Sequence, residues 1–257
     1  MTEKSTRETP SRPDRLRLDE ALVARGLSPS RARAQDAIAR GCVTVDGKPA
    51  RKAGQRVSPE AALMVDDETS GFVSRSALKL SAALEHFNID VAKRHALDIG
   101  ASTGGFTQVL LQRGADHVIA LDVGHDQLHA DLRQDPRITV IEGFNARDLT
   151  LKSLPHRPDC ITIDVSFISQ ILLLSAVTEI AAANAVLITL VKPQFEVGPG
   201  LIGKDGIVTC KESRLSAVAG VSQALADLGW DVSEPLNSPI LGGKGNQEFL
   251  LAAWKNG

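Results

Sequence analysis

Several features that would assign the chain to a particular class of protein are scarce or missing. Its only three cysteines, Cys42, Cys160 and Cys210, lie far apart and lack the spacing of a metal site. Such cysteines are typical of reduced thiols in a cytoplasmic protein. The net charge is only −2, so the total charge does not indicate a nucleic-acid partner. What remains is an ordinary globular composition, with 43% hydrophobic residues available for a core.

A hydrophobic run uniform enough to cross a membrane is also missing. The longest apolar stretch, residues 171–191, contains Glu179 and Asn184 and changes its period midway. It predicts a buried helix followed by a buried strand. The first fifteen residues are polar and lack the apolar centre of a signal peptide, so we expect residues 1–13 to form a disordered lead. The sequence thus favours a cytoplasmic protein without stable membrane association.

Positive charge is concentrated near the N-terminus. Residues 11–60 contain eleven Lys or Arg and six Asp or Glu, whereas the remainder of the chain is acidic on balance. A basic end on a nearly neutral chain points to a partner that carries phosphate groups.

This basic segment predicts two helices followed by short strands. Ser28 followed by Pro29 is typical of a helix N-cap and first helical position, and Gly41 is typical of a helix end. The expected elements are helices over 16–24 and about 29–40, a strand over 43–45, a hairpin-type turn at 46–47, and a further strand at 57 or 63–65.

The segment GCVTVDGKPARKAGQRV resembles the small RNA-binding domain first described in a ribosomal small-subunit protein, which also occurs in pseudouridine synthases and tyrosyl-tRNA synthetases. The resemblance implies an α+β domain over residues 14–66, whose second helix and following turn present basic side chains to an RNA backbone. The implied RNA-binding residues are Arg31, Arg33, Arg40, Lys48, Arg51 and Lys52. The alternative interpretation is a charged helix face that contacts only solvent.

Over residues 75–257 the pattern changes to strands and helices in alternation. Short apolar strands are expected at 95–99, 117–121, 138–141, 160–165, 185–191 and 248–254. Helical segments lie between most of them, which is typical of a doubly wound α/β sheet. We therefore predict a Rossmann-like α/β domain that follows a linker over residues 67–74.

The segment LDIGASTGGF, residues 97–106, follows the first of these strands and opens a helix. Its glycines allow a sharp turn and the close approach of a ligand. The dinucleotide fingerprint G-x-G-x-x-G is missing because position 102 is serine. The segment resembles instead the first motif of S-adenosylmethionine-dependent methyltransferases. Asp122 ends the next strand about 20 positions further on, where an acidic residue is placed to bind two ribose hydroxyls.

This resemblance implies S-adenosylmethionine as the cofactor, with its adenine edge near Asn145 or the backbone of Ala146. The expected cofactor-binding residues are Gly100, Ala101, Ser102, Thr103, Gly104, Asp122, Asn145 and Ala146. Two simpler interpretations stay open. The loop of small residues could only link strand to helix, and Asp122 could be a helix cap.

Two other patterns resemble known sites without matching them. Residues 198–205, GPGLIGKD, nearly fit a phosphate-binding loop, but Asp205 would repel phosphate and offers no hydroxyl to magnesium. We expect a mobile loop near the active site there. His125 and His129 are four residues apart and could share a helix face, but no third ligand is evident, so no metal is expected.

Four charged residues stand at expected element ends. The segments SRSALKL, DVSFIS, VKPQFE and GNQEFLL contain Lys79, Asp164, Lys192 and Glu248. The carboxyl ends of parallel strands converge on one crevice, and a final antiparallel strand would bring its first residue there. In methyl transfer to a ribose hydroxyl, which is an in-line displacement, a lysine can remove the hydroxyl proton while carboxylates orient the lysines.

This Lys-Asp-Lys-Glu order resembles the FtsJ-like ribose 2′-O-methyltransferases. Together with the basic N-terminal segment, the whole chain from about Arg15 resembles the TlyA family, whose members methylate the ribose of cytidine in ribosomal RNA and often carry the label hemolysin. The resemblance implies Lys192 as the central base, with Lys79 and Glu248 tuning and positioning it. Asp164 would orient Lys192 and would itself lie near the methyl group.

Ribosomal RNA or ribosomal subunits are therefore the expected partners. Three other functions compete with this hypothesis. A membrane-active cytolysin is opposed by the missing signal peptide, spanning helix and basic amphipathic helix. A non-catalytic ribosome-assembly factor is opposed by the intact set of four charged residues. A small-molecule methyltransferase is opposed by the basic N-terminal domain.

Overall fold

The chain forms two compact units. The computed structural model describes residues 15–67 and 70–255; one unit ends at Gly71 and the other begins at Phe72. Each unit has a hydrophobic core of its own. The predicted linker, residues 67–74, spans this boundary, and the predicted lead, residues 1–13, lies outside the described residues.

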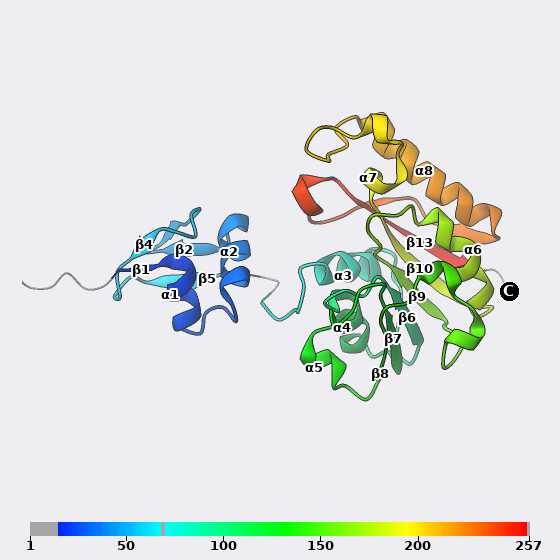
Figure 1. Ribbon diagram of the computed structural model, residues 1–257, viewed down its shortest axis with the longest axis horizontal. Helices are drawn as coiled ribbons and strands as arrows, with labels where there is room; N and C mark the ends of the chain where they lie inside the picture. The colour runs from blue at the N-terminus through cyan, green and yellow to red at the C-terminus, as the bar shows by residue number, and fades with distance from the viewer. Residues whose placement is uncertain (1–14, 68–69, 256–257) are drawn as a thin grey trace, which may run out of the picture. The chain divides into compact units, whose positions relative to one another are not determined.

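The N-terminal unit is a small α+β domain (Figure 1). Helices α1 (Leu18–Ala24) and α2 (Arg31–Arg40) share a core with an antiparallel sheet of β3 (Lys48–Pro49), β2 (Val43–Val45) and β5 (Leu63–Val65), in that order. A separate pair is formed by β1 (Leu16–Arg17) and β4 (Arg56–Val57). Fully or almost fully buried Leu18, Leu22, Ile38 and Val43 lie at the centre of this core.

Both helices of this unit begin later than the sequence predicts. Arg17 has extended backbone angles and pairs with Arg56, so the predicted first turn of α1 is a short strand instead. Ser30 rather than Ser28 caps α2, because the Ser30 hydroxyl accepts a hydrogen bond from the backbone nitrogen of Arg33 at 3.3 Å. The proline therefore lies before the helix and not inside it.

The predicted end of α2 and the predicted hairpin are confirmed. Gly41 follows α2 in the left-handed conformation, with φ +83°, and its backbone N–H donates to the carbonyl of Ile38. Asp46 and Gly47 connect β2 to β3 with φ values of +51° and +74°, as a tight hairpin turn requires.

The larger unit is built on one mixed sheet in the order β11-β13-β10-β9-β6-β7-β8, with β12 paired to β13. The parallel strands are β6 (His95–Ile99), β7 (His117–Leu121), β8 (Ile138–Ile141), β9 (Cys160–Ile163) and β10 (Val186–Val191). Strand β13 (Phe249–Lys255) runs antiparallel to β10, and β11 (Trp230–Val232) and β12 (Leu236–Asn237) run antiparallel to β13. The predicted α/β sheet and its final antiparallel strand are confirmed.

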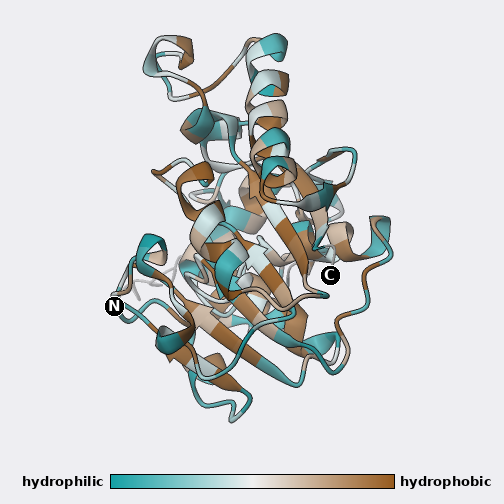
Figure 2. Ribbon diagram, turned by 90° about the vertical axis from the view of Figure 1, so that its right-hand side faces the viewer, coloured by the Kyte–Doolittle hydropathy of each residue, from teal (hydrophilic) through white to brown (hydrophobic). Residues whose placement is uncertain are grey.

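Helices cover both faces of this sheet (Figure 1). One face packs against α3 (Ala77–His86), α4 (Gly105–Gln112) and α5 (Ala130–Arg133), and the other against α6 (Ile171–Ile180) and α8 (Lys211–Asp227). Alternate residues of a strand enter the two cores: Leu97 and Ile99 of β6 pack on the α6 side, and Ala96 packs on the α3 side. Figure 2 shows mostly hydrophobic strands, as a sheet buried on both faces requires.

Three details of this unit differ from the sequence prediction. Strand β9 ends at Ile163, two residues early, because the chain leaves the sheet to form a loop. The short strands β11 and β12 were not predicted, since two or three residues carry no measurable period. His125 and His129 do not share a helix face, because α5 begins only at Ala130.

None of the helices in the described part of the chain has the length and apolar character that a membrane crossing requires. The stretch 171–191 is confirmed as helix α6 followed by the buried strand β10. Within residues 15–67 and 70–255, no group of three or more His, Cys, Asp or Glu is arranged to hold a metal ion.

The strand order reverses at β6. Strands β7 and β8 lie on one side of it, and β9 and β10 lie on the other. Open α/β sheets bind their ligands outside the carboxyl ends of the strands at such a reversal. The loops that follow β6 and β9 are therefore the first place to look for a functional site.

Candidate active site

The loop after β6 lies directly against the loop after β9. Gly100 has a φ of +83°, and a side chain there would place its Cβ 2.6 Å from the carbonyl oxygen of Asp164. The backbone nitrogens of Gly100 and Ala101 donate to the carbonyl of Leu121 at 2.8 and 3.1 Å, which ties the loop to β7. Only glycine fits at position 100 without displacing one of the two loops.

Asp122, at the end of β7, organises the same loop. Its Oδ2 accepts a hydrogen bond from the backbone nitrogen of Ser102 at 2.8 Å, and its Oδ1 accepts one from Gly124 at 2.7 Å. Each carboxylate oxygen has a further lone pair. Asp122 can therefore hold the loop in place and still accept hydrogen bonds from the hydroxyl groups of a ligand.

A cavity of about 430 Å³, here called the cofactor cavity, opens beside these loops. Five of the predicted cofactor residues line it: Gly100, Ser102, Asp122, Asn145 and Ala146. Its other lining side chains include five that the sequence did not single out: Val123, Gln127, Phe144, Ile168 and Leu173. A carboxylate beside apolar and aromatic walls fits a ribose joined to a flat heterocycle, and the volume suits a ligand of that size.

The remaining predicted cofactor residues lie elsewhere. Ala101 and Thr103 line a smaller cavity of about 210 Å³, which shares Gly100 and Ser102 with the cofactor cavity. Gly104 lines neither of these two cavities; it precedes α4 in the left-handed conformation, with φ +97°. Its position in the motif reflects the turn into α4.

The side-chain oxygen of Asn145 is already hydrogen-bonded within its own loop. That oxygen accepts hydrogen bonds from the backbone nitrogen and the Nε of Arg147, at 3.1 and 3.3 Å. The groups available to contact a ligand are therefore the side-chain nitrogen of Asn145 and the backbone of this loop, which follows β8.

The four charged residues expected at element ends form two ion pairs. The Nζ of Lys79 lies 2.6 Å from Oε2 of Glu248, and the Nζ of Lys192 lies 2.7 Å from Oδ1 of Asp164. The side chains of Lys79 and Glu248 are only 8% and 2% exposed. Buried pairs of this kind keep a fixed geometry, because separating them leaves an uncompensated charge.

Strand pairing explains why these residues meet. Val191, the last residue of β10, pairs with Phe249, the first residue of β13. Lys192 follows one strand and Glu248 precedes the other, so both lie just beyond this pair of residues, at the same end of the two strands. Asp164 follows β9, the parallel neighbour of β10, and Lys79 lies in the first turn of α3.

A second cavity of about 430 Å³, here called the substrate cavity, adjoins the ion pairs. Lys79, Lys192 and Glu248 line it. It shares Ser166 and Phe167 with the cofactor cavity. Phe167 is 91% exposed and has a φ of +66°, and its ring centroid lies 5.2 Å from that of Phe195. The ion pairs thus border two adjoining cavities, with an exposed aromatic ring at the boundary that the cavities share.

A buried asparagine joins two loops that wall the substrate cavity. Asn246, 2% exposed, donates from Nδ2 to the carbonyl of Gly206 at 2.9 Å and accepts at Oδ1 from the backbone nitrogen of Val208 at 3.0 Å. Ile202 and Gly206 also line the cavity. The loop that contains residues 198–205 therefore borders the substrate cavity, and its mobility stays a prediction.

Asp98 is the one fully buried carboxylate behind this site among the described residues. Its Oδ1 and Oδ2 each accept a hydrogen bond at 2.7 Å, from the hydroxyls of Thr162 and Thr107. Burial raises the pKa of Asp98 from 3.8 to about 6, while the two hydroxyls and the nearby Asp164 modify this value in opposite directions. Asp98 thus joins β6, β9 and α4. Near neutral pH its buried negative charge lowers the stability of the fold.

Asp98→Asn is expected to stabilise the fold more at pH 7 than at pH 4. A carboxyl group whose pKa is raised on folding contributes stability below its unfolded pKa, and this contribution is lost as the pH rises through the folded value. The shift from 3.8 to about 6 corresponds to about 3 kcal/mol.

Urea unfolding of both proteins at several pH values measures this effect. The free energy of unfolding of the variant minus that of wild type should rise by up to about 3 kcal/mol between pH 4 and pH 7. A constant difference across this range would show that Asp98 titrates normally in the native state.

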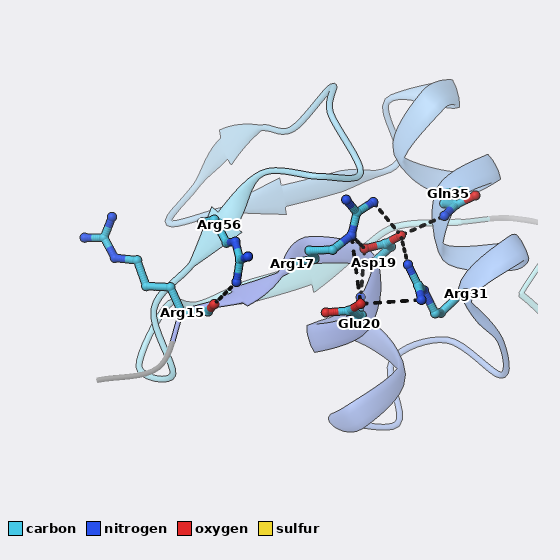
Figure 3. A network of polar contacts seen from close by, with 7 residues as sticks. All are labelled: Arg15, Arg17, Asp19, Glu20, Arg31, Gln35 and Arg56. Carbon is cyan, nitrogen blue, oxygen red and sulfur yellow. Dashed lines mark hydrogen bonds and ion pairs between the residues drawn. The ribbon is translucent and has the colours of Figure 1, made fainter. Parts of the chain in front are cut away.

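In the N-terminal unit, a buried carboxylate organises two arginines (Figure 3). Asp19, fully buried, accepts hydrogen bonds from Arg17 at 3.0 and 3.1 Å, from Arg31 at 3.3 Å and from Gln35 at 2.7 Å. Arg31 also lies 3.4 Å from Glu20. These arginines hold the pKa of Asp19 well below its usual range. Arg31 therefore helps to join α1 to α2, which the sequence did not reveal.

The predicted RNA-binding residues differ in how they are held. Arg40 pairs with Asp36 at 2.9 Å and with Asp67 at 2.6 Å, and its side chain is 22% exposed. Arg33 is half-buried on α2. Lys48, Arg51 and Lys52 are exposed, and no ion pair to them occurs within residues 15–67 and 70–255. These last three present the best available charges for a phosphate backbone.

Replacing Lys48, Arg51 and Lys52 together by alanine is expected to weaken RNA binding at least about tenfold. Each lost phosphate contact should also lower the slope of log K against log [salt] by about 0.7 to 0.9. Titration of labelled ribosomal RNA at several salt concentrations measures both quantities. A double variant of exposed lysines in the other unit, Lys152→Ala with Lys211→Ala, serves as control. Equal affinities and slopes for all three proteins would remove this triad from the RNA-binding surface.

The chain matches two protein-family descriptions. Residues 72–255 match the FtsJ-like methyltransferase family, and residues 16–63 match the S4 domain. The first match covers most of the chain and contains the cofactor cavity and both ion pairs.

Similar proteins span nearly the whole chain. The 16S/23S rRNA (cytidine-2′-O)-methyltransferase TlyA of Mycobacterium tuberculosis is 47% identical over 92% of this chain and 89% of its own length. The protein named Hemolysin A of Brachyspira hyodysenteriae is 39% identical over 91% of this chain and 98% of its own. A solved structure provisionally described as a hemolysin from Streptococcus thermophilus matches with a TM-score of 0.75, 38% identity, and coverage of 94% and 89% of the two chains.

Proposed function

The chain belongs to the FtsJ-like methyltransferases, in the TlyA family, and from this membership we propose that it methylates the ribose 2′ oxygen of cytidine in ribosomal RNA, with S-adenosylmethionine as the methyl donor. The observation that carries the proposal is the two ion pairs, Lys192 with Asp164 and the buried Lys79 with Glu248, which border the two cavities. A protein with this substrate would act in the cytoplasm, where ribosomal subunits assemble.

The cofactor cavity supports S-adenosylmethionine as the donor. When bound, this cofactor supplies an electrophilic methyl group on a positively charged sulfur. Asp122 would accept hydrogen bonds from the ribose hydroxyls, and the apolar side chains of Phe144, Ile168 and Leu173 would surround the adenine. Gly100 lets the loop after β6 approach the loop after β9, so that Asp164 borders the same cavity as Asp122.

Lys192 is the group placed to remove the proton from the 2′ hydroxyl. It borders the substrate cavity and the small cavity beside Gly100, so a hydroxyl held there lies between Lys192 and the cofactor. In its neutral form, the amino group would take the hydroxyl proton as the oxygen attacks the methyl carbon, and the cofactor sulfur would leave with the electrons of the bond that breaks. Asp164 orients Lys192 and stabilises the ammonium ion that results.

Lys79 and Glu248 also line the substrate cavity. Their mutual ion pair leaves the Lys79 ammonium close to the site without an uncompensated charge. Gly242 gives the Glu248 carboxylate room, because a Cβ there would lie 1.9 Å from Oε1 of Glu248.

Phe167 suits a nucleotide substrate. Enzymes that modify a nucleotide in structured RNA must take it out of its stack, and an exposed aromatic ring gives the displaced base a new stacking surface. Phe167 lies at the boundary of the substrate cavity, with Phe195 beside it. The S4 domain adds the exposed charges of Lys48, Arg51 and Lys52 for the RNA backbone.

The test is methyl transfer from labelled S-adenosylmethionine to three substrates: small subunits, large subunits and deproteinised ribosomal RNA, each from cells that lack this gene. Label in RNA supports the proposal and identifies the substrate. Absence of label from all three, with cofactor binding demonstrated by calorimetry, would contradict it. That result would favour a ribosome-assembly factor or a small-molecule methyltransferase.

A second candidate function is cytolysis, because relatives carry hemolysin names. Leakage of dye from liposomes at nanomolar concentrations of pure protein measures it directly. We expect no leakage, since the apolar residues of the described sheet are buried between its helices.

A further inference from the structure

Ser166 is the residue next to the reactive groups that the function above leaves without a role. Its Oγ accepts a hydrogen bond from Nζ of Lys192 at 2.8 Å. The same nitrogen lies 2.7 Å from Oδ1 of Asp164, two positions earlier in the chain. Ser166 also lines the cofactor cavity, the small cavity and the substrate cavity. It therefore stands where the cofactor, the base and the substrate would meet.

The contact between Lys192 and Ser166 matters because the amino group of Lys192 has few hydrogen-bonding directions. A neutral lysine amino group has two N–H bonds and one lone pair. If one N–H donates to Ser166 and the other lies toward the Asp164 carboxylate, which forms an ion pair but no aligned hydrogen bond with Lys192, the lone pair points in the third direction. Lys192 lines both the small cavity and the substrate cavity, so this third direction is the one available to a substrate hydroxyl.

We propose that Ser166 is a positioning residue, which fixes the rotation of the Lys192 amino group so that its lone pair faces the substrate hydroxyl. This proposal rests on the proposed methyl transfer and adds a residue to its machinery. Asp164 alone cannot do this, because a single contact leaves the second N–H and the lone pair free to exchange positions. The next residue, Phe167, has φ +66°, and this turn directs Ser166 and Phe167 into the same region.

The charged groups that border the same cavities as Lys192 also determine its protonation. They are Asp164, Lys79, Glu248 and Lys244. None of them changes when Ser166 is replaced. The hydroxyl of Ser166 accepts a hydrogen bond from Lys192 and so favours its ammonium form. Removing the hydroxyl should therefore favour the neutral amine as well as loosen its orientation.

Ser166→Ala, Ser166→Thr and the control Ser216→Ala on the exposed face of α8 test the proposal. The measurements are kcat from pH 5 to pH 10, KM for RNA, and cofactor affinity by calorimetry. Ser166→Ala should lower kcat about tenfold, as expected for the loss of a hydrogen bond to the ammonium group that forms as Lys192 takes the proton. The acid limb of its pH profile should move to lower pH. Ser166→Thr, which keeps a hydroxyl, should stay within about threefold of wild type.

Four results would overturn the proposal in a wild-type enzyme that is active in the same assay. The first is an unchanged kcat in Ser166→Ala. The second is a lower kcat with an unmoved acid limb, which indicates a structural role only. The third is a change confined to cofactor affinity, and the fourth is equal loss in the alanine and threonine variants. An inactive wild-type enzyme would contradict the proposed function itself, which keeps the two failures apart.

Discussion

Lys192→Ala is expected to lower the rate of methyl transfer by about 10²- to 10⁴-fold, while the affinity for S-adenosylmethionine stays within about twofold. The lysine lies at the end of β10, and its Nζ contacts Asp164 and Ser166 between the cofactor and substrate cavities. Lys192 does not line the cofactor cavity, so its loss should remove the base and leave the cofactor site intact. Single-turnover rates and calorimetry measure the two effects.

Lys192→Arg separates the two possible roles of this residue. Arginine keeps a positive charge beside Asp164 but does not release its proton in the working pH range. If Lys192 acts as a base, the arginine variant should be about as inactive as the alanine variant. If its charge alone stabilises the reaction, the arginine variant should recover most of the rate. A rate for Lys192→Ala within tenfold of wild type would remove Lys192 from the chemistry altogether.

Asp122→Ala is expected to weaken cofactor binding by about 10- to 100-fold. The carboxylate organises the loop through the backbone nitrogens of Ser102 and Gly124, and its remaining lone pairs face the cofactor cavity. Two losses therefore add: the preformed loop and the contacts with the ribose hydroxyls, each worth on the order of 1 kcal/mol or more. At saturating cofactor, most of the methyl-transfer rate should return.

Asp131→Ala is the matched control for this prediction. Asp131 lies on α5, and its side chain is 89% exposed. Calorimetric titration of wild type and both variants gives the affinities, and thermal unfolding shows whether each protein remains folded. Equal affinity of Asp122→Ala and wild type would show that Asp122 has no part in holding the cofactor.

Hydrophobic patterning predicted the larger unit well, because its strands are buried on both faces. The bounds of β6, β7 and β8 agree with the predicted ones to the residue. The edge strands β11 and β12 escaped prediction, since a strand of two or three residues is defined by its partner β13 and not by its own pattern. The helix starts near Ser30 and Arg17 were misplaced because several nearby residues could cap or extend a helix equally well.

The residues of the candidate site could be predicted from the sequence, but the contacts between them could not. Lys192 and Glu248 were expected together because strand ends converge, and the register of β10 with β13 brings them to one rung. No local pattern reveals that Lys79 pairs with Glu248, 169 residues away. The same holds for Arg40, whose pairing with Asp67 depends on how α2 packs against the end of β5. Ser166 lay within a recognised motif, but only the fold shows its contact with Lys192.

The most direct test of the central claim is the chemical position of the transferred methyl group. Ribosomal RNA labelled by the pure enzyme would be hydrolysed in alkali, which cleaves the backbone only where the 2′ hydroxyl is free, and the resistant dinucleotides would be identified. Label in an alkali-resistant dinucleotide that begins with cytidine is the result we predict, and it should vanish in Lys192→Ala. Label on a base, in RNA that alkali cleaves completely, would contradict the claim that this site methylates a ribose.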